Sequence, residues 1–462
     1  MERLELQGKR VTVVGLARSG VAACKALAER GAVVLGSDLR PGDKLAADLA
    51  DLGRRGVAIE TGGHTEAAFL NADLIVISPG VETEHPLLAA ARLRGIPVWG
   101  EVELAYRLTD ARFLAVTGTN GKSTTTSLTG AMLEAAGIPS LVAGNIGTAL
   151  CEVAPGLGVD HWIVAELSSF QLETVVSFRP RIAVLLNLAP DHLDRYADVG
   201  DYYRAKARIF LSQTPEDAAV LNAEDPLIPQ YAAPLRARPL LFSRAHTVGD
   251  GAFVRAGQVV VRRGGRSAPV CPVSDIRILG LHNLENALAA AAAAAEAGAS
   301  PEAIAAALRD FRGLPHRLEP VGERGGVRFI NDSKGTNVGA VRKSLEGFGQ
   351  GVILIAGGKD KGGDFTPLRP LVESRVKRLL LLGQAARKIR EQLHGACPME
   401  AVESLEEAVR RGAALAEPGD TVLLSPACAS FDMFRDFEHR GEVFRQAVQE
   451  LLGARDVERR HG

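Results

Sequence analysis

Residues 112–126 read R-F-L-A-V-T-G-T-N-G-K-S-T-T-T and decide the fold of the central part of the chain. The apolar run 113–116 is typical of a buried parallel strand, and the residues after Lys122 favour a helix. The two glycines between them let backbone N–H groups approach an anion, and a helix N-terminus adds partial positive charge. The stretch therefore predicts a phosphate-binding loop, in which Lys122 reaches the terminal phosphates and the Ser123 hydroxyl binds Mg²⁺.

This loop departs from the usual G-x-x-x-x-G-K-[ST] spacing. Val116 stands at the position of the first glycine, and Gly118 gives the shorter pattern G-x-x-G-K-S. The alternative interpretation is an ordinary strand-to-helix turn. A lysine in the first turn of a helix opposes the helix dipole, so that alternative leaves Lys122 unexplained.

Length and composition limit the class of protein. A chain of 462 residues predicts about three domains, and a formal net charge of −1 argues against a nucleic-acid or membrane-surface binder. No apolar run is long enough to span a membrane, and the N-terminus lacks the apolar core of a signal peptide. The five cysteines are far apart, which predicts neither a disulfide framework nor a zinc site and favours the cytoplasm.

The first 100 residues predict a small α/β domain with a nucleotide-like crevice. The strand 9–14 is followed by the turn G-L-A-R-S-G at 15–20, an alanine-rich helix and a second strand that ends at Asp38. This pattern resembles a dinucleotide fingerprint, in which the acid holds a ribose hydroxyl. The alternative is a doubly wound sheet whose turn simply needs small residues. A third strand ends at Ser78, and we expect its end to lie in the same crevice.

Two further strand ends in the central part carry acidic groups. Strand 162–165 ends at Glu166, and strand 182–186 runs into N-L-A-P-D-H-L-D at 187–194. A carboxylate there is well placed to reach Mg²⁺ beside the phosphate loop, whereas an N-cap acid is the alternative for Glu166. The ionisable groups at 191–194 suggest metal binding or acid–base work.

The helical segments are less specific. Spacing alone favours a solvated lysine at Lys206, in a helix expected over 202–210. Asn283 and Asn286 lie one helical turn apart at the start of a long alanine helix, so they either face one ligand or cap the helix. From about residue 313 strands again alternate with helices, which predicts another mostly parallel sheet with its polar loops facing one crevice.

Taken together, the motifs resemble the Mur ligases. They are G-T-N-G-K-S-T (118–124), G-N-I-G (144–147), E-L-S-S-F-Q-L (166–172), D-H-L-D-R-Y (191–196), G-L-H-N-x-x-N (280–286), G-L-P-H-R (313–317) and N-D-S-K-G-T-N (331–337). The ending S-P-A-C-A-S-F-D-x-F (425–434) is similar to the members that add the second amino acid of the stem peptide. The resemblance implies three α/β domains. They are a Rossmann-like UDP-substrate domain (1–100), a central P-loop ATPase-like parallel sheet (101–312) and a C-terminal Rossmann-like domain contributing to ATP and amino-acid binding (313–462).

The resemblance also implies a reaction of peptidoglycan precursor synthesis. ATP would phosphorylate the carboxylate of UDP-N-acetylmuramoyl-L-alanine, and the amine of D-glutamate would displace phosphate from that acyl phosphate. A cytoplasmic monomer that binds these small molecules, and neither nucleic acid nor membrane, is the accompanying expectation.

Site residues carried over from the family fall into four groups. ATP would contact Gly118, Thr119, Asn120, Gly121, Lys122, Ser123, Thr124, Asn283, Asn286, Arg317, Asp332 and Lys334. The UDP-substrate would contact Leu16, Ala17, Asp38, Arg40, Ser78, Gly80 and Asn145, and D-glutamate would contact Thr336, Lys361, Ser430 and Phe437. Two Mg²⁺ ions would be held by Ser123, Glu166, His192 and Lys206, with Lys206 carbamylated by CO₂. The implied catalytic set is Lys122, Asn145, Glu166, His192 and Lys206.

Two other classes of protein compete with this hypothesis. An NAD-dependent oxidoreductase rests on residues 15–38 alone and gives no role to Lys122, Glu166 or Asp332. An ATP-regulated binding or sensor protein would have kept the fold and lost catalysis. The retained metal-ligand candidates argue against it.

Overall fold

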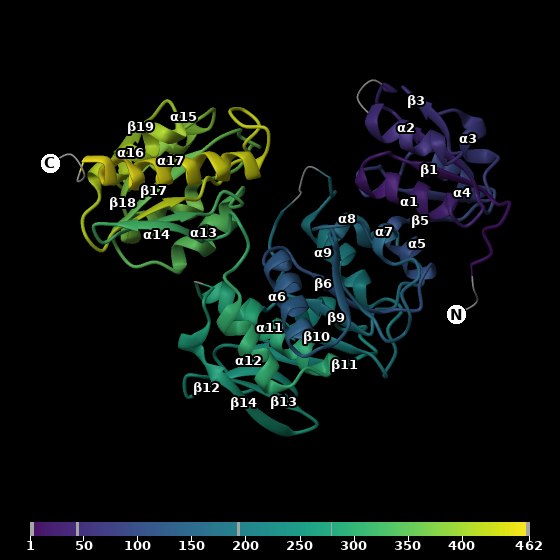
Figure 1. The fold of residues 1–462 in the computed structure, drawn as a ribbon, viewed down its shortest axis with the longest axis horizontal. Helices are drawn as coiled ribbons and strands as arrows, with labels where there is room; N and C mark the ends of the chain where they lie inside the picture. The colour runs from purple at the N-terminus through teal and green to yellow at the C-terminus, as the bar shows by residue number, and fades with distance from the viewer. Residues whose placement is uncertain (1–3, 43–45, 192–194, 279, 459–462) are drawn as a thin grey trace. The chain divides into compact units, whose positions relative to one another are not determined.

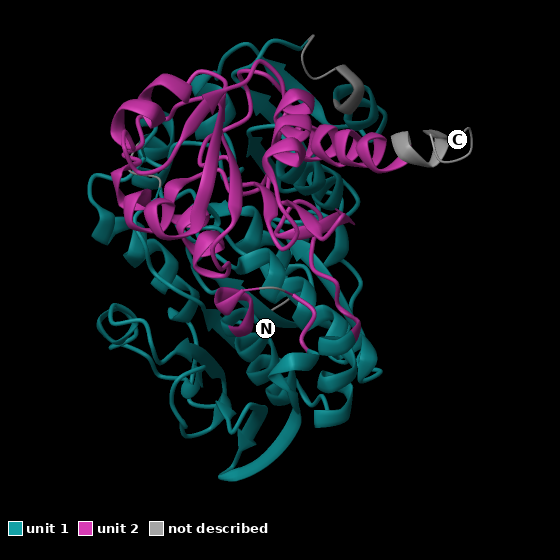
Figure 2. Cartoon of the chain, turned by 90° about the vertical axis from the view of Figure 1, so that its left-hand side faces the viewer, with its two compact units in different colours: residues 1–275, 285–309 teal, residues 276–284, 310–462 magenta. Residues whose placement is uncertain are grey.

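The chain contains three sheets and two compact units. The computed structural model describes residues 4–42, 46–191, 195–278 and 280–458 (Figure 1). The first unit comprises residues 1–275 and 285–309, and the second comprises residues 276–284 and 310–462 (Figure 2). Two of the sheets belong to the first unit and the third belongs to the second unit.

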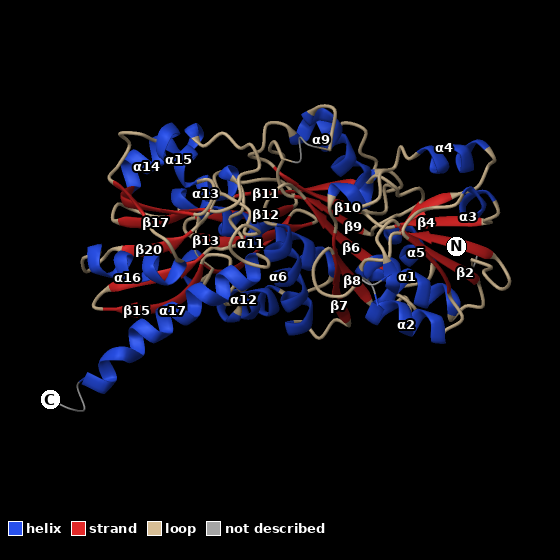
Figure 3. Ribbon diagram, turned by 90° about the horizontal axis from the view of Figure 1, so that it is seen from above, coloured by secondary structure: helices blue, strands red, loops and turns tan. Residues whose placement is uncertain are grey.

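The first sheet is all-parallel, with the strand order β3-β2-β1-β4-β5. Its strands are β1 (Arg10–Val14), β2 (Val33–Asp38), β3 (Ala58–Thr61), β4 (Leu74–Ile77) and β5 (Val98–Gly100), and its helices are α1 (Arg18–Ala28), α2 (Ala46–Arg54), α3 (Glu66–Leu70), α4 (Pro86–Leu93) and α5 (Glu101–Arg107). Helices α3 and α4 cover one face of this sheet, and α1 and α2 cover the other (Figure 3). The strand order reverses between β1 and β4, so a crevice forms where these strands end.

The central sheet has nine strands in the order β14-β13-β12-β11-β10-β9-β6-β8-β7. The strands are β6 (Arg112–Thr117), β7 (Ser140–Gly144), β8 (Trp162–Glu166), β9 (Ile182–Leu185), β10 (Ala218–Asn222), β11 (Arg238–Ser243), β12 (Gly251–Arg255), β13 (Gln258–Arg263) and β14 (Arg266–Pro272). The helices are α6 (Lys122–Ala135), α7 (Leu150–Val153), α8 (Ser169–Leu172), α9 (Val199–Ala207), η2 (Arg208–Phe210), α10 (Ile228–Tyr231), η3 (Val273–Asp275), α11 (Leu281–Ala297) and α12 (Pro301–Asp310). Strand β6 lies between β8 and β9, so the loops after these three strands meet at one edge.

The third sheet has the order β15-β16-β20-β17-β18-β19, and only its edge strand β15 is antiparallel to its neighbour. The strands are β15 (Glu319–Arg324), β16 (Val327–Asn331), β17 (Val352–Gly357), β18 (Val376–Leu382), β19 (Met399–Ala401) and β20 (Thr421–Leu424). The helices are α13 (Val338–Glu346), η4 (Thr366–Leu368), α14 (Arg369–Arg375), α15 (Ala386–Gln392), α16 (Leu405–Leu415) and α17 (Phe437–Glu458). Helices α13 to α15 pack on one face and α16 and α17 on the other, each over its own buried cluster (Figure 3).

The predicted fold class is confirmed, since three α/β sheets of mainly parallel strands are present. The sequence analysis missed the antiparallel extension β12–β14, which begins at Gly251. These strands carry arginines among their apolar residues, as in Q-V-V-V-R-R, and so lack the continuous apolar run of a buried parallel strand. The domain boundaries at residues 100 and 312 stay predictions. In the described part of the chain, every helix is too short or too polar to cross a lipid bilayer.

Strand β6 supplies a direct test of the packing. Leu114 is 0% exposed in the middle of the central sheet, whereas Leu93 at the end of α4 is 90% exposed. We expect Leu114→Ala to lower the free energy of unfolding of the first unit by about 2–5 kcal/mol, because it leaves a cavity. The matched variant Leu93→Ala is expected to change it by less than about 0.5 kcal/mol. Chemical denaturation measures both, and equal effects would contradict the assignment of β6 to the core.

Candidate active site

The loop after β6 is held in place by the end of β9. The Asn120 N–H donates to Asn187 Oδ1 at 2.9 Å, and Asn187 Nδ2 donates back to the Asn120 carbonyl at 3.0 Å. The Thr119 N–H donates to the Asn187 carbonyl at 3.0 Å. The sequence analysis gave Asn187 no role, although it stands directly after a predicted strand.

Gly121 marks the end of this loop and is the N-cap of α6. Its φ of 86° lies in the left-handed region, which favours glycine. A Cβ at this position would collide with the side-chain amide of Asn286, so only glycine fits both the turn and its neighbour. The structure thereby brings Asn286 against the loop, and its contact with ATP stays a prediction.

Two lysine side chains converge on one backbone carbonyl. Lys122 Nζ donates to the carbonyls of Gly118 and Thr119 at 2.9 and 3.0 Å. Lys206 Nζ donates to the same Gly118 carbonyl at 2.9 Å. Because both Nζ atoms contact this one oxygen, the two lysines lie close together and would repel each other if both were protonated.

Lys206 is not the solvated lysine that spacing alone favours, and that interpretation is wrong. The residue is 1% exposed, and its Nζ lies 4.5 Å from the centroid of the Tyr202 ring. Burial, followed by repulsion from Lys122, lowers the pKa of Lys206 well below its ordinary value, although Asp191 and Glu166 oppose the shift. A buried lysine in this setting favours its neutral amine. The spacing gave no sign of this burial, because α9 has a weakly apolar pattern, and only the family resemblance singled out Lys206.

Glu166 ends β8 with one carboxylate oxygen satisfied and the other not. Asn145 Nδ2 donates to Oε1 at 2.7 Å. Oε2 is buried and has no hydrogen-bond partner among the described residues. The N-cap alternative is wrong, because Ser168 caps α8 through a capping box with Gln171. A buried carboxylate oxygen without a donor suits a cation, so Glu166 fits the predicted Mg²⁺ site.

The remaining predicted metal ligands are less defined. Ser123 is buried in the first turn of α6, close to Lys122 in sequence. His192 lies outside the described residues. No cluster of three or more His, Cys, Asp or Glu side chains with metal-binding geometry occurs in the described ranges.

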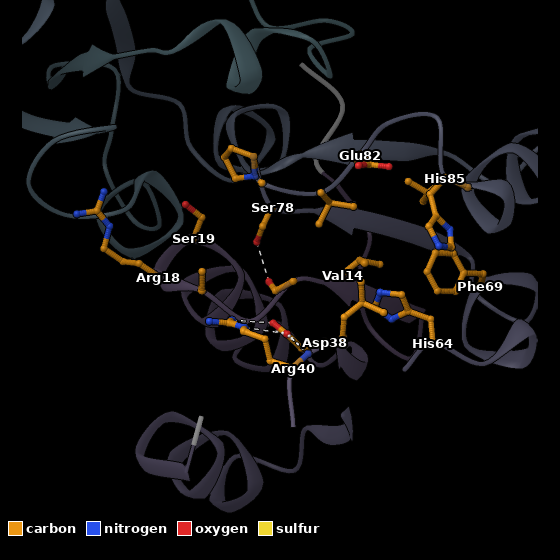
Figure 4. Close-up of a pocket in the computed structure, with 17 residues that line it drawn as sticks. Val14, Arg18, Ser19, Asp38, Arg40, His64, Phe69, Ser78, Glu82 and His85 are labelled. Atoms are coloured by element: carbon orange, nitrogen blue, oxygen red, sulfur yellow. Dashed lines mark hydrogen bonds and ion pairs between the residues drawn. The ribbon is translucent and has the colours of Figure 1, made fainter. Parts of the chain in front are cut away.

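A pocket of about 580 Å³ lies in the first sheet's domain (Figure 4). Five of the predicted UDP-substrate residues line it: Ala17, Asp38, Arg40, Ser78 and Gly80. Leu16 is buried beside it and contributes its backbone N–H, which donates to Asp38 Oδ2 at 2.6 Å. Asn145 belongs to the central sheet instead, in the loop after β7.

Asp38 is satisfied by the protein itself. Its oxygens accept from the Leu16 N–H and from the backbone N–H, Nε and Nη2 of Arg40. Burial raises the pKa of Asp38, but the bonds from Arg40 and Leu16 outweigh burial and bring the pKa to about 2. All acceptor directions of this carboxylate are therefore in use, and its evident effect is to orient Arg40 along the pocket wall.

Three aromatic side chains in the same pocket were missed by the sequence analysis. His64, Phe69 and His85 lie together at one end of the pocket, and Arg18 and Ser19 lie toward the other (Figure 4). His64 follows β3, a short strand that the sequence analysis did not predict, so the loop after it was not considered. The motif G-G-H at 62–64 was the available signal.

The second unit contains another strand-end cluster, centred on Asp332. Its Oδ2 accepts from the hydroxyls of Ser344 and Ser425 at 2.7 and 2.6 Å, and its Oδ1 accepts from the Leu318 N–H at 3.3 Å. Burial raises the pKa of Asp332 to about 6, and these hydrogen bonds only partly offset that effect. Asp332, which is predicted to contact ATP, therefore also connects three separate segments of its own unit by hydrogen bonds.

Other predicted residues of this unit gather around Lys334. Its Nζ lies 3.5 Å from the centroid of the Phe437 ring, which brings together one ATP and one D-glutamate candidate. Ser430 is buried, Thr336 is half-buried and Lys361 is exposed. Of the other two ATP candidates of this unit, Asn283 is buried and Arg317 is half-buried.

Arg440 was missed, although it joins the two loops of this cluster. Its buried guanidinium donates to Ser333 Oγ at 2.9 Å, to the Ser333 carbonyl at 2.7 Å and to the Cys428 carbonyl at 3.2 Å. These bonds connect the loop that carries Lys334 to the loop that carries Ser430. No carboxylate accompanies the guanidinium in these contacts, and burial lowers the pKa of Arg440 to about 10.

Known protein families match all three domains in order. The Mur ligase MurD-like N-terminal domain matches residues 9–100, the Mur ligase middle domain matches residues 116–294, and the Mur ligase glutamate ligase domain matches residues 316–428. The chain is similar in fold to a pseudomurein peptide ligase type C from Methanothermus fervidus, with a TM-score of 0.61, 19% identity and coverage of 96% of this chain and 100% of that chain.

Curated relatives are similar over nearly their whole length. The UDP-N-acetylmuramoylalanine--D-glutamate ligase of Acidobacterium capsulatum is 49% identical over 98% of both chains. The protein of the same name from Geobacter metallireducens is 47% identical over 97% of this chain and 99% of its own.

The buried Asp332 predicts a pH dependence of stability in the second unit. Its folded pKa of about 6 lies above the ordinary value of 3.8, so the folded state holds this proton more tightly. Its contribution is fully present below pH 3.8 and is lost as pH rises through about 6, a loss of up to about 3 kcal/mol. The side chain of Asp332→Asn cannot lose a proton. The free energy of unfolding of this variant, measured by denaturation between pH 4 and 7, is therefore expected to lack the decrease that Asp332 causes in the wild type. The exposed Asp364→Asn is the control, and a profile shared by Asp332→Asn and wild type would overturn the assignment.

Proposed function

We infer that this chain, which belongs to the Mur ligase family, is an ATP-dependent ligase that joins D-glutamate to UDP-N-acetylmuramoyl-L-alanine in peptidoglycan precursor synthesis. One observation carries this conclusion: the 49% identity to the Acidobacterium capsulatum ligase extends over 98% of both chains. The similarity therefore includes the nucleotide loop, the first-domain pocket and the C-terminal unit together.

The chemistry needs an activated carboxylate. A carboxylate oxygen of the muramoyl substrate attacks the γ-phosphorus of ATP, and ADP leaves with the electron pair of the broken P–O bond. The amine of D-glutamate then attacks the acyl-phosphate carbon, phosphate leaves from the tetrahedral intermediate, and the nitrogen loses a proton. Catalysis of this kind depends mainly on positioning and on positive charge around the phosphates.

The phosphate loop supplies that charge in our proposal. Lys122 turns from the carbonyls of Gly118 and Thr119 to the terminal phosphates, which are stronger acceptors for an ammonium group. Ser123 and Glu166 are proposed to hold one Mg²⁺, and the unsatisfied Oε2 of Glu166 supports this assignment. When bound, Mg²⁺ neutralises charge on phosphate oxygens.

Lys206 is proposed to act as a carbamate and, with His192, to hold a second Mg²⁺. Its amine must be neutral to form a bond to CO₂, and burial and Lys122 both favour that state. Addition of CO₂ to the neutral amine forms the N–C bond, releases one proton and leaves an anion in place of the amine. That anion would be attracted to Lys122, whereas a protonated Lys206 would be repelled by it, which gives this chain its own physical reason for the modification.

The remaining predicted site residues are assigned to the three substrates. We propose that the first-domain pocket holds the uridine diphosphate, with Arg40 and the N-terminus of α1 near phosphate, and that Asn145 contacts the acyl-phosphate region. ATP is proposed to extend to Asn283, Arg317, Asp332 and Lys334, and D-glutamate to contact Thr336, Lys361, Ser430 and Phe437.

The setting is proposed to be the cytoplasm. All five cysteines are free thiols, as a reducing compartment maintains them. The monomeric state stays a prediction.

Phosphate release tests the proposed function directly. We expect the protein to release phosphate from ATP only when UDP-N-acetylmuramoyl-L-alanine and D-glutamate are both present. A panel with L-glutamate, L-alanine, D-alanine and meso-diaminopimelate in place of D-glutamate checks the amino acid. Release that is independent of the second amino acid, or faster with another member of the panel, would reject the proposed substrate.

The same assay tests the loop. Lys122→Ala is expected to lower the rate by about 1,000-fold or more, because a positioned cation at the transferring phosphate is lost. Lys25→Ala removes a partly exposed lysine of the same unit and is expected to leave the rate unchanged. Near-normal turnover of Lys122→Ala would remove Lys122 from the catalytic set.

Lys206 is tested by chemical rescue. Lys206→Ala is expected to be nearly inactive and to regain activity with millimolar short-chain carboxylic acids, since a small carboxylate can occupy the vacated space. Lys122→Ala is the matched variant that no acid is expected to rescue. Full activity of Lys206→Ala in CO₂-depleted buffer, or wild-type activity of Lys206→Arg, would show that no carbamate is needed.

A further inference from the structure

The loop that follows β7, residues 144–148, lies at the edge of the central sheet and is called here the β7 loop. Strand β7 is the last strand of that sheet, and among the described strands it pairs with β8 alone. Backbone carbonyls on its outer side therefore lack a donor from a neighbouring strand. The phosphate loop differs, because β6 has a strand on both sides and Asn187 holds the loop. The β7 loop depends on a donor from another element.

Arg18, at the N-terminus of α1, supplies this donor. Its Nη1 donates to the Gly147 carbonyl at 2.6 Å, and its Nη2 donates to the carbonyls of Gly144 and Asn145 at 3.1 and 3.4 Å. A planar guanidinium carries five N–H donors, so it can serve several carbonyls at once. Figure 4 shows the side chain turned away from Asp38, at the end of the pocket opposite the aromatic rings.

Asn145 connects the β7 loop to Glu166. Its backbone N–H donates to the Glu166 carbonyl at 2.9 Å, and its Nδ2 donates to Glu166 Oε1 at 2.7 Å. Gly144 has a φ of 109°, and a Cβ there would collide with the Glu166 carbonyl, so the loop lies directly against the end of β8. The Asn145 amide occupies Oε1 and leaves Oε2, which has no partner among the described residues, to face a cation.

The segment after the β7 loop has a separate support. Glu101 Oε1 accepts from the Cys151 N–H at 2.8 Å, and α7 packs against α1 and α5. Leu150 and Cys151 are buried, whereas Arg18 is exposed. Loss of the Arg18 side chain is therefore expected to loosen the β7 loop and to leave α1 and α7 folded.

We propose that Arg18 is a positioning residue for the reaction: by holding the β7 loop, it keeps the Asn145 amide on Glu166 and so fixes the carboxylate that is proposed to bind Mg²⁺. In this role Arg18 acts through Asn145 and does not contact the reacting atoms. The inference rests on the proposed function, which assigns a metal to Glu166. Since Arg18 also lines the first-domain pocket, one side chain joins that pocket to the metal site within the first unit.

A different role for Arg18 would be to bind a phosphate of the ligand in the pocket. A guanidinium with that role alone would change the affinity for the ligand, and saturation with the ligand would restore the rate. A guanidinium that positions the β7 loop changes the rate at saturation, because more substrate does not correct a misplaced metal ligand. The value of kcat therefore separates the two roles.

Phosphate release at saturating ATP, D-glutamate and UDP-N-acetylmuramoyl-L-alanine tests Arg18→Ala. We expect kcat to fall roughly 10- to 100-fold. The Kd of UDP, measured by calorimetry without turnover, is expected to change by less than about threefold, as for other exposed charges. A kcat within about threefold of the wild type, together with weaker binding of UDP, would overturn the positioning role.

Arg30→Ala is the matched control. Arg30 directly follows α1, and its guanidinium donates to the carbonyls of Ala26 and Leu108 at 3.5 and 3.1 Å. The same substitution thus removes an arginine that also bonds to backbone carbonyls, but away from the β7 loop. We expect Arg30→Ala to keep the wild-type kcat. A loss equal to that of Arg18→Ala would show a general loosening of the first-domain helix instead of positioning.

A double variant tests whether Arg18 acts through Asn145. If it does, the variant with both Arg18→Ala and Asn145→Ala is expected to have the kcat of Asn145→Ala alone, within about twofold, because the contact is already lost. Two independent residues would instead give effects on kcat that multiply, and that result would overturn the proposal.

Two measurements without turnover complete the test. The backbone amides of residues 144–148 are expected to exchange with deuterium faster in Arg18→Ala than in the wild type, and at the wild-type rate in Arg30→Ala. Mn²⁺ alone, titrated and followed by electron paramagnetic resonance, is expected to bind roughly tenfold more weakly to Arg18→Ala. Unchanged exchange or unchanged Mn²⁺ affinity would overturn the proposal.

Failure of the proposed function has a different signature. The wild-type protein would then show no D-glutamate-dependent phosphate release, whereas the faster exchange of residues 144–148 in Arg18→Ala would persist. Failure of the positioning role leaves the wild-type reaction intact and removes the difference in kcat between Arg18→Ala and Arg30→Ala.

Discussion

The Gly118 carbonyl accepts hydrogen bonds from Nζ of both Lys122 and Lys206, and the central site depends on this arrangement. Two cations held on one acceptor in a buried region repel each other, so the pair is stable only if one charge is removed or an anion arrives. The loop that bears this carbonyl is held in position by three hydrogen bonds with Asn187. The site therefore favours an anion at the place where phosphate and the carbamate are proposed to lie.

Parallel sheets explain why each functional group stands where it does. In all three sheets polar residues lie at or directly after the carboxyl ends of parallel strands, and in the first sheet the reversal of strand order opens a pocket there. Asp38 at the end of β2, Glu166 at the end of β8 and Asp332 directly after β16 are equivalent in this sense. Their surroundings differ: Asp38 is satisfied by Arg40, Glu166 keeps one oxygen without a donor, and Asp332 is enclosed by two serine hydroxyls.

The first-domain pocket differs from a dinucleotide site, although the turn beside it has the dinucleotide-like pattern. The acid at the end of β2, which would hold a ribose in a dinucleotide site, is fully occupied by Leu16 and Arg40. The distinctive chemistry lies instead at the aromatic end, where Ser37 and Glu60 set the tautomer of His64. The proton position on this ring is decided by neighbours that are distant in sequence.

Local sequence by itself determined the buried parallel strands on either side of the phosphate loop, the loop itself and the acidic strand ends, because apolar runs and glycine turns act over a few residues. Family motifs supplied the class of reaction. Tertiary structure alone decided the burial of Lys206, the unsatisfied oxygen of Glu166 and the loop contact of Asn286, since each depends on a partner from another element. The antiparallel strands after Gly251 and the pairing of Ser37 with His64 also escaped prediction. The local sequence around these residues contains no recognisable motif, and their contacts form only in the folded chain.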